Sequence, residues 1–435
     1  MRATGKKLAL LCGALAVCAV LFLALLPGRE PPETAEGGYY FTRYASVDDL
    51  ALVSVENEEG SIVLTRAGGT FRALSGLPVP EDVTEIAAFF ERILYLPLRR
   101  LVEDAQASDG QYGLTEPRAT VLIQDAAQGG VMFLLGNEVP GGEGAYACLA
   151  GDQRVFVMDS AQAELFLGRA ERFLDLRLTP SLEGEDLADL TEIEVIRQGG
   201  TAYRLRQAAA SGATVYFALE EPWRLLLGAE PVKNALLTPL RQLEGVRVLE
   251  EDHSLTEDSD RFRLSFRDGS SVTVLAGPRD GENALVSAEG SGLTMLVPSA
   301  ALAFMDASPE EIMGGALLKL NVNDVRTLVL GRHTFEIENS AGALRVTRDG
   351  ASWDAAAFQD TVFQALNHIS IGGPWEGAAG TELLRLRVVS SAAEETIDLV
   401  FRRLDGRRCA VEINGQAAVW CDLAAVSPLL DAADQ

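Results

Sequence analysis

The sequence is poor in basic residues. It carries 37 Lys and Arg residues against 63 Asp and Glu residues, which gives a formal net charge of −26. A nucleic-acid-binding surface needs clustered cations that release counterions from phosphate, and anionic lipid headgroups attract the same cations. The charge therefore argues against nucleic acid as a partner and disfavours anionic headgroups. It is typical of an acidic surface kept soluble by self-repulsion.

Motifs that carry chemistry are also missing. The three histidines, His253, His333 and His368, share no motif, and neither H-E-x-x-H nor Cys-x-x-Cys occurs, so zinc has little support. The sequence has no G-x-S-x-G nucleophile elbow. Residues 141–147, GGEGAYA, approximate a phosphate loop, but strand-like residues follow where a helix is required. The sequence therefore predicts no catalytic, cofactor-binding or metal-ligating residue.

Cysteine is scarce in the main part of the chain, which contains only Cys148, Cys409 and Cys421. An odd number is a poor basis for a disulfide framework. A two-residue turn at Asn414-Gly415 would place Cys409 and Cys421 on opposite faces of a hairpin, whereas a three-residue loop would pair them. We expect buried free thiols, and the sequence leaves a disulfide between Cys409 and Cys421 open.

The sequence does contain a long apolar segment near its N-terminus. Residues 8–26 contain no charge, and as a helix they would span about 28 Å, close to the thickness of a hydrocarbon core. Basic residues precede the segment and acidic residues follow it, so the N-terminus is expected inside and the main domain outside. We predict a signal anchor in residues 1–30 of a single-pass cytoplasmic-membrane protein, and a linker over residues 31–44. A cleaved signal peptide or a lipid anchor is the alternative.

One short pattern recurs at Asp49, Asp189 and Asp324. In each copy, apolar residues occupy the first, fourth and sixth positions after the aspartate. The spacing of about 140 residues is that of a domain rather than of a solenoid repeat. After each copy come an aromatic residue, apolar residues at helical spacing, alternating strands, a hairpin and a short helix. We predict an α+β fold of three tandem repeats, each an antiparallel sheet with helices on one face. The predicted repeats cover residues 45–180, 185–318 and 320–430.

The stretch QYGLTEPRATVLI, residues 111–123, raises the question of a catalytic loop. Gly113 is suited to a positive φ angle, and Pro117 can begin a strand. The second copy keeps a glutamate, Glu257, at the position of Glu116 but lacks the glycine and the proline. The stretch is therefore interpreted as a structural corner, and Glu116 is given no catalytic role.

With these residues in view, the chain resembles a bacterial family known only as domain of unknown function 4340. The resemblance is carried by Tyr112-Gly113-Leu114 with Pro117, by Leu135-Gly136 and by Pro140-Gly141. It covers about the first third of the chain, and the later copies have lost most of the signature. The resemblance implies an N-terminally anchored accessory protein at an ABC-type exporter related to gliding-motility systems. It implies no catalytic residue.

These observations together predict a non-enzymatic, extracytoplasmic binding or accessory protein that uses no cofactor. The expected partners are the membrane, through residues 8–26, and a subunit of an ABC-type transporter or another envelope protein. Two alternatives remain open at this point. One is a cell-envelope hydrolase whose site is assembled between repeats, and the other is a purely structural envelope spacer.

Overall fold

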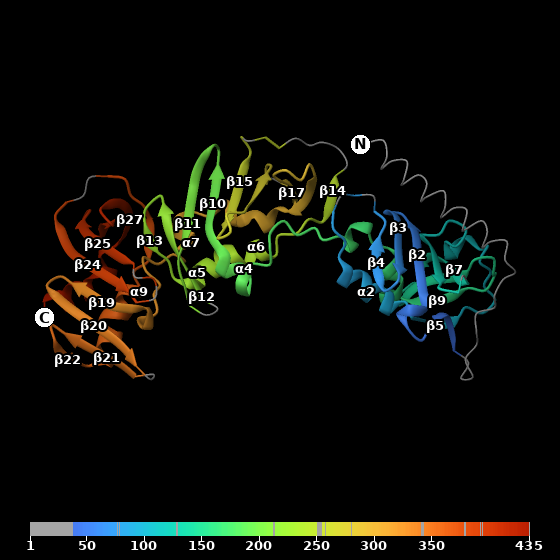
Figure 1. Ribbon diagram of the computed structural model, residues 1–435, viewed down its shortest axis with the longest axis horizontal. Coiled ribbons are helices and arrows are strands. Elements are labelled where there is room, and N and C mark those ends of the chain that lie inside the picture. The colour runs from blue at the N-terminus through green and yellow to red at the C-terminus, as the bar shows by residue number, and fades with distance from the viewer. Residues whose placement is uncertain are drawn as a thin grey trace. The chain divides into compact units, whose positions relative to one another are not determined.

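A computed structural model describes residues 38–434, except residues 76, 78, 128, 212–213, 250–254, 257, 280, 341–342, 378–379, 392 and 394. The chain divides into two compact units, one ending at Leu176 and the other beginning at Arg177 (Figure 1). The described residues form three nine-stranded sheets, one in the first unit and two in the second, and every strand pairing in them is antiparallel. The predicted antiparallel sheets are confirmed. The fold is mostly β, with short helices.

The three sheets share one strand order. The strands of the first sheet are β1 (Tyr39–Arg43), β2 (Leu50–Asn57), β3 (Gly60–Ala67), β4 (Thr70–Ala73), β5 (Tyr95–Leu101), β6 (Ala119–Asp125), β7 (Gly130–Glu138), β8 (Gly144–Leu149) and β9 (Phe156–Asp159). Their order across the sheet is β1-β5-β9-β8-β7-β6-β2-β3-β4.

The second sheet contains β10 (Leu190–Arg197), β11 (Gly200–Ser211), β12 (Thr214–Glu221), β13 (Leu225–Leu226), β14 (Arg247–Leu249), β15 (Asp260–Phe266), β16 (Ser271–Ala276), β17 (Asn283–Ala288) and β18 (Thr294–Pro298). Its order is β14-β18-β17-β16-β15-β10-β11-β12-β13. The eight strands from β14 to β12 follow the order of β5 to β4 in the first sheet. The first sheet adds β1 at one edge, and the second adds β13 at the other.

The third sheet contains β19 (Val325–Leu330), β20 (His333–Ser340), β21 (Ala343–Arg348), β22 (Ala351–Trp353), β23 (Ile371–Pro374), β24 (Glu382–Ser390), β25 (Thr396–Arg403), β26 (Arg408–Ile413) and β27 (Gln416–Asp422). Its order, β23-β27-β26-β25-β24-β19-β20-β21-β22, matches that of the second sheet strand for strand.

A β-bulge explains the aspartate pattern found in the sequence. In β2, Leu50 pairs with Asp125 and Leu52 with Gln124, so one extra residue stands in β2. This extra residue shifts the two-residue alternation of the strand, and Leu50 and Val53 are both buried although they lie three positions apart. The strands β10 and β19 have the same irregularity, between Leu190 and Glu192 and between Val325 and Thr327.

The same backbone contact accompanies each bulge. The carbonyl oxygen of the aspartate accepts a hydrogen bond of 2.8 Å from the residue that follows the neighbouring strand. The donor amides belong to Ala126 for Asp49, Arg267 for Asp189 and Ser391 for Asp324. The aspartate pattern therefore marks the same local structure at the start of a central strand in all three sheets.

Each sheet has one helical segment between corresponding strands. In the first unit this is α2 (Val83–Arg92), whose N-cap Asp82 accepts hydrogen bonds of 3.0 Å from the amides of Thr84 and Glu85. The apolar side chains of α2 at helical spacing, Ile86 and Phe90, are fully buried. Full burial of such a side chain contributes about 1.5–3 kcal/mol, so packing on the sheet stabilises this short helix more than its propensity does.

In the second unit the corresponding segments are interrupted by π-helical turns. Between β13 and β14 they are α5 (Ala229–Val232), η5 (Lys233–Leu237) and α6 (Thr238–Arg241), and between β22 and β23 they are α8 (Ala355–Phe358), η8 (Gln359–Phe363) and α9 (Gln364–Asn367). The remaining α-helices are α3 (Ser160–Ala163), α4 (Gly184–Asp189), α7 (Pro309–Ile312) and α10 (Leu423–Asp434). The 3₁₀-helices are η1 (Val47–Asp49), η2 (Gly110–Tyr112), η3 (Glu164–Phe166), η4 (Ala170–Phe173), η6 (Ser299–Asp306) and η7 (Val322–Asp324).

The Tyr112-Gly113-Leu114 stretch forms a corner that packs on the end of β7. Gly113 ends η2 with a φ angle of +67°, and the side-chain amide of Asn137 donates to the carbonyl oxygen of Gln111 at 3.0 Å. A Cβ on Gly136 would come within 3.0 Å of the Tyr112 carbonyl oxygen, closer than real Cβ atoms approach. The corner therefore requires glycine on both sides, and Glu116 is exposed.

The hairpin that carries two of the cysteines differs from our sequence analysis. Ile413 pairs with Gln416, so the two-residue turn is present. A bulge between Val411 and Glu412 then shifts the register by one residue, and Cys409 pairs directly with Cys421. The expectation that a two-residue turn separates the thiols onto opposite faces is wrong, because it assumed an unbroken ladder.

The predicted anchor, residues 8–26, and the first half of the predicted linker, residues 31–37, lie outside the described residues, whereas the second half contains β1. Among the residues that the structure describes, no helix is both long enough and apolar enough to cross a membrane. The predicted domain boundaries, at residues 45–180, 185–318 and 320–430, remain a prediction.

Candidate functional site

A cleft with a volume of ≈ 630 Å³ lies beside the third sheet, in the second unit. Strands β20 to β22 supply one wall through Phe335, Arg348 and Trp353. The helical segments η8 and α9 and the C-terminal helix α10, which packs against both, supply the rest. A turn at Asp349-Gly350, where both φ angles are positive, folds β22 back on β21 and places Arg348 and Trp353 near each other.

The cation and the two aromatic rings of the cleft are stacked. The guanidinium carbon of Arg348 lies 4.7 Å from the ring centroid of Trp353 and 5.9 Å from that of Phe335. Phe335 is buried, whereas 39% of Trp353 is exposed. Cation–π contacts at such distances contribute about 0.5–1 kcal/mol at an exposed site. In the part of the chain that the structure describes, Arg348 has no carboxylate within ion-pair distance, so the stacking holds its position.

The opposite wall of the cleft combines apolar residues with polar and acidic ones. Asp360 and Gln364 are one helical turn apart, and the amide of Gln364 donates to the carboxylate of Asp360 at 3.4 Å. Asp431 of α10 and His368 after α9 also line the cleft, and both are exposed. The cleft thus combines an aromatic wall with two carboxylates. That composition offers the aromatic wall to an apolar side chain and the two carboxylates to a basic group, while Arg348 adds a cation to the same cleft.

A histidine–aspartate pair lies on the same hairpin as Arg348. The Nδ1 atom of His333 is 2.7 Å from a carboxylate oxygen of Asp349, and Arg332 donates to Nε2 of His333 at 3.2 Å. The hydrogen bond with His333 lowers the pKa of Asp349 below its ordinary value of 3.8. Because Nε2 is already an acceptor, this arrangement lacks the free base that a catalytic triad needs. Within the described residues, neither His333 nor His368 hydrogen-bonds to a hydroxyl or a thiol.

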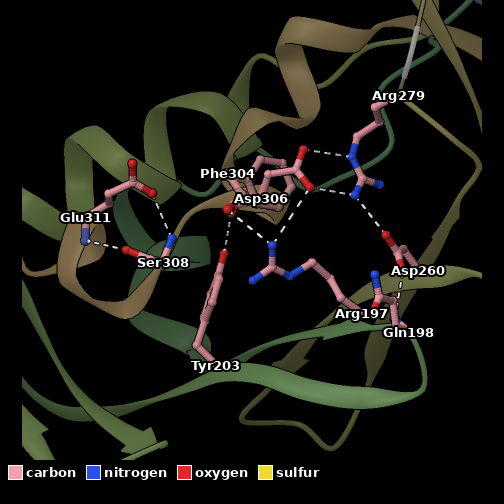
Figure 2. A network of polar contacts seen from close by, with 9 residues as sticks. All are labelled: Arg197, Gln198, Tyr203, Asp260, Arg279, Phe304, Asp306, Ser308 and Glu311. Carbon is pink, nitrogen blue, oxygen red and sulfur yellow. Dashed lines mark hydrogen bonds and ion pairs between the residues drawn. The ribbon is translucent and has the colours of Figure 1, made fainter. Parts of the chain in front are cut away.

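A polar network surrounds Arg279, which lies in the loop between β16 and β17 of the second sheet (Figure 2). Its guanidinium donates to both carboxylate oxygens of Asp306, at 3.0 and 2.7 Å, and to Asp260 at 2.8 Å. Arg197 donates to the carbonyl oxygen of Asp306 at 3.2 Å, and the buried hydroxyl of Tyr203 donates to that of Phe304 at 2.8 Å. These contacts hold η6 against the β10–β11 and β15–β16 strands.

The network does not provide a general acid and a general base. Burial alone would raise the pKa of Asp260, but hydrogen bonds from Arg279 and from the Gln198 amide lower it below 3.8 overall. A carboxylate that is held ionised and shared with an arginine is an ion pair rather than a proton donor. The arrangement is a structural clamp.

The residues weighed in the sequence analysis do not converge on one site. Glu116 is exposed at its corner, and residues 141–147 form a turn and the start of strand β8 rather than the start of a helix. His253 lies outside the described residues. No cluster of three or more His, Cys, Asp or Glu side chains in the described ranges could hold a metal ion. The cleft beside the third sheet was not anticipated.

A signal for the cleft was nevertheless present in the sequence. The dipeptide Asp349-Gly350 is a strong hairpin signal, and a two-residue turn there pairs Arg348 with Ala351 and Val346 with Trp353. Residues paired in this way share a face, so Arg348 and Trp353 become diagonal neighbours. The helical wall could not be derived in the same way, because it depends on tertiary packing.

Residues 75–258 match the family model described as "Domain of unknown function (DUF4340)". The resemblance predicted from the sequence is confirmed over this segment. A search of curated proteins and of solved structures gave no match.

The segment that matches DUF4340 begins ahead of α2 and ends before β15. It includes the Tyr112-Gly113-Leu114 corner, Leu135-Gly136 and the Pro140-Gly141 turn, which carried the resemblance in the sequence. It does not include the cleft, whose lining residues start at Phe335. The family match and the cleft are therefore separate features of the protein.

Proposed function

We propose that this protein is a non-enzymatic, membrane-anchored accessory protein that binds a protein partner outside the cytoplasm. The partner is a subunit of an ABC-type transporter or another envelope protein. The observation that carries the proposal is the cleft beside the third sheet, which presents an exposed tryptophan and two carboxylates. Partner recognition commonly uses such partly exposed aromatic anchors with a polar rim.

The cleft chemistry suggests what part of a partner enters it. An apolar side chain would lie against Trp353 and Phe335, and a neighbouring basic side chain would lie beside Asp360 and Asp431. The formal net charge of −26 would also attract a basic partner surface and accelerate association at low salt.

A photo-crosslinking amino acid at Gln364 tests the proposal in membranes of the native host. Gln364 lines the cleft and is exposed. The matched control is the same amino acid at Val246, which is 50% exposed and outside the cleft. We expect a transporter or envelope protein to be captured from Gln364 and not from Val246. Capture of the same proteins from both positions, or of none, would contradict the proposal.

The proposed anchor is residues 8–26, with the N-terminus inside and the rest of the chain outside. An apolar span is held by burial rather than by screened charge, so full-length protein should stay with membranes through high-salt and carbonate washes. Deletion of residues 1–30 should release a folded, acidic protein. A mature N-terminus found downstream of Leu26, or a lipid on Cys18, would show that the anchor is wrong.

We also propose that the three sheets are copies of one unit, each with its helical segment on one face. The common strand order and the common bulge support this. An experimental structure in which the helical segments cover opposite faces of corresponding sheets would contradict it.

A further inference from the structure

Two thiols face each other inside the third sheet. Cys409 of β26 and Cys421 of β27 are direct cross-strand partners, and their Sγ atoms are 3.2 Å apart. Both side chains are buried, at 0% and 1% exposure. The remaining described cysteine, Cys148, is buried in a small apolar cluster of the first unit without a second thiol.

We propose that Cys409 and Cys421 are a redox modification site that forms an intramolecular, cross-strand disulfide. Direct partners in an antiparallel pair have Cα atoms about 4.5–5.5 Å apart, which lies within the range that disulfides span. The sulfur atoms need to approach by about 1.2 Å to reach the bond length of about 2.05 Å. A change in the side-chain torsions of a pair already in register can achieve this without a slip of the strands.

The bulge in this hairpin is what creates the site. An unbroken ladder continued from the Asn414-Gly415 turn would place the two side chains on opposite faces. The extra residue in β27 brings Cys421 onto the face of Cys409, where Val411, Val419 and Ile413 are also buried. The pairing therefore depends on a specific local irregularity.

Oxidation requires an external disulfide, which the proposal includes as the oxidant. Either thiol can attack first with the same balance; where Cys409 attacks first, its proton goes to solvent and its thiolate is the nucleophile. It attacks one sulfur of the oxidant and expels the other as a thiolate, which leaves a mixed disulfide on Cys409. Cys421 then loses its proton to solvent, attacks the Cys409 sulfur and expels the second thiolate. The protein loses two electrons, and the oxidant disulfide becomes two thiols.

Burial determines when this reaction occurs. With both sulfur atoms inaccessible, the oxidant reaches Cys409 only while the β26–β27 hairpin is open, during folding or local opening. Once the strands close, the bond is shielded from reductants. Because the disulfide fits the native register, the folded state should favour it over the dithiol.

The test measures the thiol–disulfide exchange equilibrium of the full-length protein with glutathione in native buffer and in denaturant. No Lys or Arg follows Arg408, so trypsin releases both cysteines in one peptide, residues 409–435. After acid quenching, denaturation and alkylation, the dithiol form carries two alkyl groups, whereas the disulfide form carries none and lacks two hydrogens. Cys148, which has no second thiol in its cluster, reports how far a single thiol forms a mixed disulfide with glutathione in each sample and serves as an internal control.

We expect the exchange constant to favour the disulfide at least tenfold more in native buffer than in denaturant. The matched control is a double variant, Cys421→Ala with Asp422→Cys, which keeps almost the same loop length but moves the thiol to the other face of β27. It should show no native preference. Equal constants in the two conditions for the natural sequence, or the same preference in the control, would overturn the proposal. The result does not depend on which side of a membrane the domain occupies.

Discussion

Substitution of Gly136 by alanine tests whether the family signature is a rigid structural corner. A Cβ at position 136 would come too close to the Tyr112 carbonyl oxygen and would lie 3.1 Å from the carbonyl carbon of Gly113 and from Cδ2 of Leu114. The first two contacts are backbone atoms, so a side-chain rotation cannot relieve them. Displacing Tyr112 would also disturb its edge-on ring contact with Tyr146, whose centroid is 4.8 Å away.

The magnitude follows from two opposing effects. Overpacking against a fixed backbone destabilises by about 1–3 kcal/mol, and the rigid contact at position 136 places the effect at the upper end, about 3 kcal/mol. The φ angle of Gly136 is not positive, so alanine can adopt it. Because alanine also lowers the conformational entropy of the unfolded chain, it offsets about 0.4–1 kcal/mol of the destabilisation. The net loss of stability at the corner is about 2 kcal/mol. Gly110 is the matched control, because a Cβ there meets nothing within 4 Å and its φ angle is also ordinary.

Cys148 reports on this corner. Its thiol is buried in the same small cluster as Leu114, and burial raises its pKa to about 12, so a thiol reagent modifies it only after opening. All four tryptophans lie in the second unit, and their fluorescence would not follow this region. A loss of about 2 kcal/mol should increase the labelling rate of Cys148 roughly 30-fold in Gly136→Ala, with no increase in Gly110→Ala. Equal rates in both variants and the natural protein would refute a rigid corner.

Three further outcomes follow from the second unit. Tyr203→Phe should lower its stability by about 1 kcal/mol, measured by tryptophan fluorescence in denaturant, since the hydroxyl donates to the buried Phe304 carbonyl; an unchanged midpoint would contradict the contact. The pKa of Asp260 is lower in the folded protein than its ordinary value of 3.8, so ionised Asp260 stabilises the fold above pH 3.8, and this stabilisation is lost as the pH falls through the folded-state pKa. The difference in stability between the natural protein and Asp260→Asn should therefore shrink in acid. A difference that grows in acid would contradict the direction of the pKa shift. Trp353→Ala should reduce crosslinking from Gln364 at least several-fold, with stability lowered only by about the 0.5–1 kcal/mol of its stacking on Arg348; undiminished crosslinking would show that Trp353 is not part of the binding surface.

Much of the fold could be predicted because its signals are local. The aspartate pattern located the first central strand of each sheet, and apolar spacing located α2 and its counterparts. The pattern could not explain why Leu50 and Val53 both face the core, because a bulge is set by the neighbouring strand. In our sequence analysis an unbroken ladder separated the thiols of Cys409 and Cys421, and in the structure the same kind of irregularity brings them together.

The candidate site was less accessible to prediction. Arg348 and Trp353 are near each other in sequence, and the Asp349-Gly350 turn could have paired them. The wall formed by Asp360 and Asp431 comes from segments far apart in the chain, and only the packing of α10 against η8 brings them to one cleft. Residues that carry no motif and meet through tertiary packing leave little trace in one sequence.

The outermost strands of the three sheets are all short, from the two residues of β13 to the five of β1. An exposed strand edge is a template on which another chain can add a strand, and the number of hydrogen bonds on offer limits how firmly it adheres. One edge strand, β23, also ends in Pro374, which has no amide to donate. The proposed anchor would concentrate copies of the protein on a membrane surface, where these short edge strands would keep neighbouring molecules from joining their sheets into fibrous aggregates.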